Sequence, residues 1–124
     1  MSNRGRELAI LIGSFAISFA AFAIGFGDWR FGLGFVLLIL VHELGHIVEA
    51  RRQGLHVSLP TFIPLIGAYV TIRHAGLAPW RNALVSLAGP LVGGLAAAGL
   101  WAVGSARSSH LLLQLAYIGF LLNA

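Results

Sequence analysis

The chain has 124 residues, of which 58% are hydrophobic and only 10% are charged. Because soluble domains carry about 25% charged residues, this composition excludes an ordinary soluble protein and predicts a membrane protein. Eight basic residues, all of them arginine, and four acids give a net charge of +4. The arginines are scattered at the ends of apolar segments. This excludes a clustered nucleic-acid-binding surface and indicates the headgroups of the lipid bilayer as their partners.

Residues 8–26 form an uncharged run preceded by Arg4 and Arg6. At about 1.5 Å per residue, such a run crosses roughly 30 Å of hydrocarbon. The alternative is a cleavable signal peptide, because the Ala-Phe-Ala sequence at 21–23 resembles a cleavage site. The run is longer than the roughly 7–15 apolar residues of a signal peptide, so we favour an uncleaved transmembrane helix.

A second segment, residues 31–50, is wholly apolar up to Val41 and is closed by Arg51 and Arg52. Gly54 follows, and a glycine just past the last helical turn is a common stop. The length of the segment predicts a second transmembrane helix that ends close to one membrane surface.

The second half of this helix carries the sequence His42-Glu43-Leu44-Gly45-His46. Positions i and i+4 lie on one helix face about 6 Å apart along the axis, so both imidazoles can reach one metal ion. Glu43 lies about 100° around the helix from His42, where it is poorly placed as a ligand and well placed to take a proton from a water molecule. This HExxH spacing is typical of zinc hydrolases. Charged or strongly polar side chains near the middle of a membrane helix cost roughly 2.5–3.5 kcal/mol each and usually mark a functional site.

Between residues 54 and 80 no uncharged run reaches spanning length, and three prolines interrupt the pattern. Residues 68–73 are rich in β-branched and aromatic side chains and predict a short strand, with residues 56–59 as its partner. Non-helical backbone at membrane depth is tolerated only where it is buried in protein or lines a wet cavity. We therefore expect a short re-entrant or interfacial β-hairpin beside the metal site.

Residues 83–104 form a third uncharged span. Gly89 and Gly93 make a GxxxG pair in it, which lets helices approach closely, and Pro90 should bend the helix.

After a connection in which Ser108 or Ser109 is the expected N-cap, residues 111–122 give only about 20 Å of apolar helix, less than the bilayer core. The predicted fold is an all-α polytopic membrane protein. We expect about four transmembrane helices, the last one truncated, with the hairpin between the second and the third.

The arginines also predict an orientation in the cell membrane. With a cytoplasmic N-terminus, six arginines fall inside and two outside, as the positive-inside rule requires. The inner set is Arg4, Arg6, Arg51, Arg52, Arg73 and Arg81, and the outer set is Arg30 and Arg107. This orientation puts the HELGH end of its helix near the cytoplasmic face.

The metal site is incomplete in this sequence, because a hydrolytic zinc has about three protein ligands and the motif supplies only two, the imidazoles of His42 and His46. Glu49 lies about 10 Å along the helix from His42, too far to meet the same ion, and we assign it as an ion-pair partner of Arg51 or Arg52. The remaining histidines, which are His56, His74 and His110, fall in loops or at helix ends. We expect residues 1–124 to be one membrane-embedded domain that is incomplete at its C-terminus, with the third ligand beyond Ala124.

Three motifs over roughly residues 31–123 together resemble the site-2 protease family of intramembrane zinc metalloproteases. They are HELGHIVEARRQG, PTFIPLIGAYV and NALVSLAGPLVGG, in the order in which the family has them. The resemblance implies zinc held by His42 and His46, Glu43 as the general base, and cleavage of peptide bonds in or near transmembrane helices of membrane-protein substrates. It also implies a third ligand from an aspartate on a later helix.

Two positions, one that departs from the family pattern and one that resembles it, limit the roles that can be assigned. Gly93 stands where many relatives carry asparagine, so a polar contribution from that position is missing. Asn123 resembles an asparagine that often precedes the family's downstream NLLP-like motif, and we assign it no oxyanion-binding role.

The strand predicted at residues 68–73 could hold an extended substrate by edge pairing, which makes Tyr69, Val70 and Thr71 the candidate substrate-binding residues. A purely structural cover is the alternative for this hairpin.

Two other classes of function remain open. One is a non-enzymatic scaffold, in the form of an inactive or truncated relative, and the other is a metal transporter that uses His42 and His46 as a transit site. The transporter is disfavoured because residues 8–26 and 83–104 offer only serine as polar side chains. We expect proteolysis from the full-length protein and none from residues 1–124 alone.

Overall fold

The computed structural model describes residues 3–64, 66–70, 72–73 and 78–123. Its helices are α1 (Asn3–Phe26), α2 (Trp29–Arg52), α3 (Pro79–Ala106) and α4 (His110–Asn123). Between α2 and α3 lie the strands β1 (His56–Val57), β2 (Thr61–Ile63), β3 (Gly67–Tyr69) and β4 (Ile72–Arg73). The predicted order of four helices, with strands between the second and the third, is confirmed.

Three of the helices are long and apolar enough to cross a membrane. They are Arg4–Phe26, Trp29–Arg52 and Pro79–Ala106, and they contain the three spans predicted from the sequence. α4 is apolar but has only 14 residues, so it is shorter than a bilayer-spanning helix, as expected.

Two helix ends follow the signals in the sequence. Gly54 adopts a φ of 82° just past α2, and its N–H donates to the carbonyl of Arg51 at 2.9 Å. Ser109, rather than Ser108, caps α4, because its hydroxyl accepts from the N–H of Leu112 at 3.3 Å.

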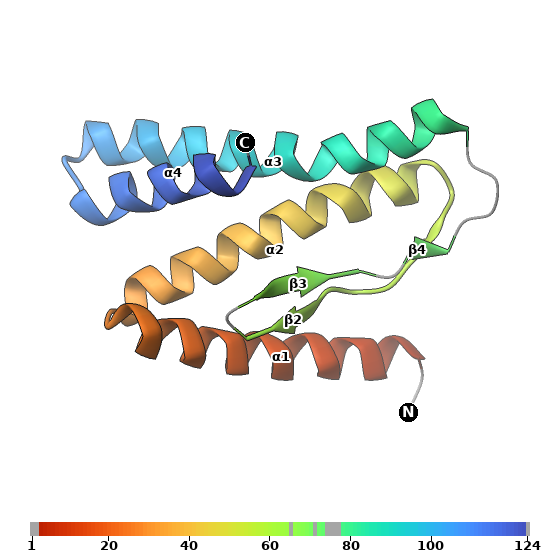
Figure 1. Cartoon of the computed structure of the whole chain (residues 1–124), viewed down its shortest axis with the longest axis horizontal. Coiled ribbons are helices and arrows are strands. Elements are labelled where there is room, and N and C mark those ends of the chain that lie inside the picture. The colour runs from red at the N-terminus through yellow and green to blue at the C-terminus, as the bar shows by residue number, and fades with distance from the viewer. Residues whose placement is uncertain (1–2, 65, 71, 74–77, 124) are drawn as a thin grey trace.

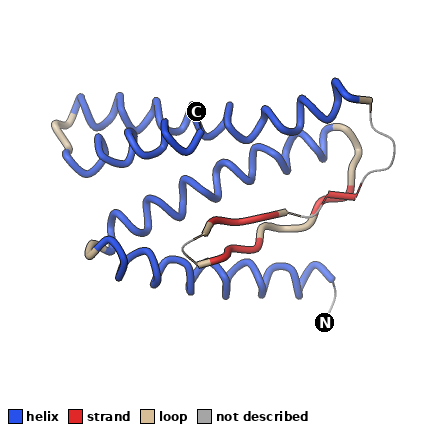
Figure 2. Tube along the Cα trace, viewed as in Figure 1, coloured by secondary structure: helices blue, strands red, loops and turns tan. Residues whose placement is uncertain are grey.

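The strands form two short antiparallel pairs, β1 with β4 and β2 with β3 (Figure 2). The predicted pairing of the 56–59 region with the end of the 68–73 strand is confirmed for His56–Val57 and Ile72–Arg73. The prediction of one continuous strand over residues 68–73 is wrong, because β3 and β4 are separate and β3 pairs with the unpredicted strand β2. The physical reason is Pro60, which lies between β1 and β2 and has no N–H to donate. It interrupts the strand with which a continuous strand over residues 68–73 would have to pair.

Figure 1 shows the arrangement of these elements. α3 and α4 run side by side, α2 crosses next to them, and the strand pair β2–β3 lies between α2 and α1. A buried cluster of Phe22, Val36, Ile39 and Phe62 joins α1, α2 and β2. α1 is therefore packed into the domain through the face that contacts the hairpin and α2.

The helix ends fall into two groups at opposite ends of the molecule. The α1–α2 and α3–α4 turns lie at one end of the molecule, whereas the N-terminus, the end of α2 and the start of α3 lie at the other (Figure 1). The predicted inner and outer helix ends therefore fall at opposite ends of the fold.

Candidate metal centre

His42 and His46 are one turn apart on α2, and their Nε2 atoms lie 3.1 Å from each other. The two rings are nearly perpendicular, with centroids 4.8 Å apart. The i,i+4 spacing read from the sequence therefore brings both imidazoles to one point on the side of α2 that packs against α3 and α4.

The hydrogen bonds of the other ring nitrogens fix the tautomer of each histidine. Nδ1 of His46 lies 2.7 Å from the carbonyl oxygen of Val85 on α3. A carbonyl only accepts, so Nδ1 of His46 carries the hydrogen and its Nε2 is left with a free lone pair.

Nδ1 of His42 lies 2.7 Å from Oδ1 of Asn123 on α4. The amide of Asn123 is oriented by its own Nδ2, which donates to the carbonyl of Gly119 at 2.8 Å. His42 is therefore the donor to Asn123, and its Nε2 also keeps a free lone pair. No role at this site was predicted for Asn123, which lies 81 positions from His42 in the sequence.

This arrangement fits a metal ion between the two imidazoles. Two unprotonated Nε2 atoms that face each other repel unless a cation or a proton lies between them. Two nitrogen ligands of a tetrahedral zinc ion, each at about 2.0–2.1 Å, stand roughly 3.3 Å apart, close to the separation found here. Metal-binding histidines typically donate their other N–H to a carbonyl or carboxylate, as both do here to amide oxygens.

Within the described part of the chain, no group of three or more His, Cys, Asp or Glu side chains is placed to hold a metal ion. Glu49 forms an ion pair with Arg52 at 2.6 Å, which confirms one of its two predicted partners. His56 and His110 are exposed, and Nε2 of His110 lies 3.3 Å from Nε2 of Gln114. His74 lies outside the described residues, and the third ligand beyond Ala124 stays a prediction.

Glycines allow the close helix contact that this site needs. A Cβ added at Gly45 would overlap the carbonyl oxygen of Ala88, and one added at Gly89 would overlap the ring of His46. The predicted GxxxG face of α3 is thus confirmed as a close contact, and Gly89 specifically makes room for a candidate ligand.

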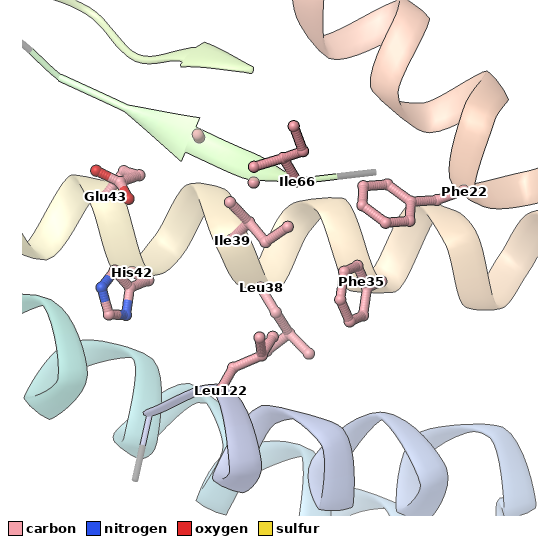
Figure 3. A pocket seen from close by; sticks show the side chains of 10 residues that line it. Phe22, Phe35, Leu38, Ile39, His42, Glu43, Ile66 and Leu122 are labelled. Carbon is pink, nitrogen blue, oxygen red and sulfur yellow. The ribbon is translucent and has the colours of Figure 1, made fainter. Parts of the chain in front are cut away.

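Glu43 points from α2 toward the hairpin, whereas His42 points toward α3 and α4 (Figure 3). Both residues line a cavity of about 240 Å³ that is otherwise mostly apolar. Its walls come from α1, α2, β3, the turn before β3, and α4: Phe22, Phe35, Leu38, Ile39, His42, Glu43, Ile66, Gly67, Ala68 and Leu122. Ligand-binding cavities are commonly lined by apolar side chains with a few polar groups, as this one is with His42 and Glu43.

The edge of β3 that borders this cavity is open, in that no other described strand pairs with it. The N–H of Phe62 on β2 donates to Oγ of Ser14 on α1 at 3.0 Å, so it points away from β3. In an antiparallel ladder, when the N–H of one residue points away from the partner strand, the N–H and C=O of the residue opposite it also point away. The residue opposite Phe62 is Ala68. The backbone N–H and C=O of Ala68 therefore point away from β2, on the side where Ala68 and Glu43 line one cavity.

Two of the three predicted substrate-binding residues lie next to this edge. Tyr69 ends β3 and is half exposed, and Val70 follows it. Neither is among the residues that line the cavity, which are instead the earlier positions Ile66, Gly67 and Ala68. Thr71 lies outside the described residues, so the roles of all three stay predictions.

Comparison with known proteins agrees with the motifs. The profile of Peptidase family M50 matches residues 30–120, most of the chain. A Synechocystis sp. protein whose name describes it as a zinc metalloprotease is 35% identical over 81 residues, 62% of this chain and 21% of that protein. A chloroplastic protein of Arabidopsis thaliana, also named as a zinc metalloprotease, is 37% identical over 76 residues, 57% of this chain and 14% of that protein.

The chain thus spans about a fifth or less of the length of these relatives. No solved structure matches the chain at a significant level. The family profile covers far more than half of the chain, including the HELGH helix and the glycine-rich span. The chain therefore belongs to Peptidase family M50, the site-2 protease family of metalloproteases.

Proposed function

We propose that this chain carries the zinc-binding helix of an intramembrane metalloprotease that hydrolyses peptide bonds in or near the transmembrane segments of membrane proteins. The observation that carries the proposal is the pair of Nε2 atoms 3.1 Å apart, with each Nδ1 bonded to an acceptor on another helix. The site lies on a helix long and apolar enough to cross a membrane, and the adjacent cavity contains Glu43.

Each polar group has a role in this proposal. His42 and His46 would hold the zinc ion through Nε2, with the third ligand expected from beyond Ala124. When bound, zinc polarises the scissile carbonyl and makes an adjacent water molecule more acidic. Glu43 accepts a proton from that water and passes it to the departing amide nitrogen, as a general base and then a general acid.

The open edge of β3 is proposed to hold the substrate. A transmembrane helix satisfies its own backbone hydrogen bonds and must unwind before its peptide bonds can react. An unwound segment has free N–H and C=O groups, which the outward-facing backbone of Ala68 can pair. Tyr69, which ends β3, and the next two residues in the sequence, Val70 and Thr71, are proposed to contact the substrate beside this edge.

A vesicle assay separates the protease from its two rivals, the scaffold and the metal transporter. The full-length protein, reconstituted in lipid vesicles with a membrane-anchored substrate, is expected to cleave the substrate. A chelator should abolish cleavage, and added zinc should restore it. Zinc flux across the same vesicles without cleavage would support the transporter, and neither activity would support the scaffold.

The orientation is proposed to place the N-terminus and the active-site end of α2 in the cytoplasm. The inner helix ends carry more arginine than the outer ones, in accord with the positive-inside rule. Reporters fused after Arg52 and after Arg81 are expected to give a cytoplasmic signal, and one after Arg107 the opposite signal. An external signal after Arg52 would contradict the orientation.

A further inference from the structure

The hydrogen bond between Asn123 and His42 joins α4 to the candidate metal centre. We propose that Asn123 is a positioning residue for zinc binding, and that Gly93 is the position that makes room for it. The inference rests on the proposed function, because it concerns the same metal site. It assigns to Asn123 and Gly93 a role at the metal site, where the sequence pattern gave them none.

The first step is the orientation of the Asn123 amide. Its Nδ2 lies 2.8 Å from the carbonyl of Gly119, one turn earlier on α4, and its Oδ1 lies 2.7 Å from Nδ1 of His42. Rotating the amide by 180° would set its oxygen against the carbonyl of Gly119, where two acceptors would face each other. The amide is therefore held with its acceptor toward His42.

The second step concerns what this acceptor does to the imidazole. Neutral imidazole has one N–H, and an acceptor at Nδ1 keeps that hydrogen on Nδ1. His42 then presents the lone pair of Nε2 toward Nε2 of His46, where the metal is proposed to lie. Without the acceptor, His42 can rotate or place its hydrogen on Nε2, and either change removes a ligand.

The third step explains the glycine at position 93. A Cβ added at Gly93 would overlap Oδ1 of Asn123 and would lie 2.5 Å from its Cγ and 2.7 Å from its Nδ2. Any side chain at position 93 therefore displaces the amide from His42. The space next to Gly93 on α3 is filled by the amide of Asn123 from α4. This amide therefore provides the polar group that the glycine at position 93 lacks.

The test is the zinc affinity of the full-length protein in detergent, measured by competition with a chelator of known affinity. Asn123→Ala is expected to weaken zinc binding by about 10- to 100-fold, the usual effect of losing the partner of a metal-binding histidine. Gly93→Ala should weaken it comparably, by displacing the amide. The double variant Asn123→Ala/Gly93→Ala should bind no more weakly than Asn123→Ala, because both changes remove one interaction.

Matched variants separate positioning from general packing. Gly94→Ala adds a methyl group beside Gly93 where no atom lies within 4 Å, and it should leave the zinc affinity unchanged. Asn123→Asp keeps an acceptor for His42 and should bind zinc more tightly than Asn123→Ala. If Asn123→Ala and Gly93→Ala lower the melting temperature of the metal-free protein but keep the wild-type zinc affinity, the inference is overturned.

The same measurement distinguishes this inference from the proposed function. His42→Ala must lose zinc if the metal site is correct. Retained zinc binding in His42→Ala would overturn the site itself. Lost binding in His42→Ala together with wild-type affinity in Asn123→Ala would leave the site in place and reject only the role of Asn123.

Discussion

Replacing Glu43 with glutamine in the full-length protein is expected to lower the rate of peptide hydrolysis by about 10²- to 10⁴-fold, the range for loss of a general base. Glutamine has nearly the same shape as glutamate but cannot accept the proton of the attacking water. Glu43 faces the cavity next to β3 and forms no ion pair with another described residue, so the substitution breaks no structural contact of that kind.

The matched measurement is the zinc content of the same preparation. The metal is proposed to be held by the two imidazoles and not by the Glu43 carboxylate, so Glu43→Gln should bind as much zinc as the wild type. His46→Ala, in contrast, should lose both zinc and activity. A glutamine variant with full turnover would remove Glu43 from the mechanism, and one that loses zinc would make Glu43 part of the metal site.

The parts of this structure that sequence predicts well are those governed by local periodicity. Long apolar runs predict α1, α2 and α3 because the bilayer sets the length of a spanning helix. The i,i+4 spacing of His42 and His46 fixes their shared face once α2 is a helix, and so predicts the approach of their Nε2 atoms. Gly54 predicts the end of α2 because only a residue tolerant of positive φ fits there.

The contacts that complete the site could not be predicted in this way. Val85 contributes a backbone carbonyl. Every residue type has this group, so the identity of residue 85 does not indicate the contact. Asn123 reaches His42 only because α3 and α4 fold back beside α2. The GxxxG pair predicted a close contact of α3, but sequence alone does not say that Gly89 faces His46 and Gly93 faces Asn123.

The hairpin shows a limit of another kind. β2 has only three residues and lies between Pro60 and Pro64, so its pattern is too short to be read as a strand. What reveals the open edge is the hydrogen bond from the N–H of Phe62 to Ser14, a contact between the hairpin and α1. The location of the substrate edge at Ala68 therefore depends on tertiary structure.

Replacing Ala68 with proline tests whether this edge holds the substrate. Proline removes the N–H that points out of the sheet and puts its ring carbon in the path of an incoming strand. Because this N–H does not pair with β2, the β2–β3 ladder should remain. One lost hydrogen bond accounts for about 0.5–1.5 kcal/mol, so kcat/KM for a membrane-anchored substrate should fall by about 2- to 13-fold.

The control is Ala68→Ser, which keeps the N–H and a small side chain where Ala68 packs against the buried cluster. It should cleave at nearly the wild-type rate, and both variants should bind as much zinc as the wild type, since Ala68 contacts the substrate and not the metal in this proposal. A loss that appears mainly in KM indicates substrate binding that is equal in the ground and transition states. Wild-type kcat/KM in Ala68→Pro would reject edge pairing at this position. The hairpin would then act as a cover of the cavity, the alternative that the sequence had left open.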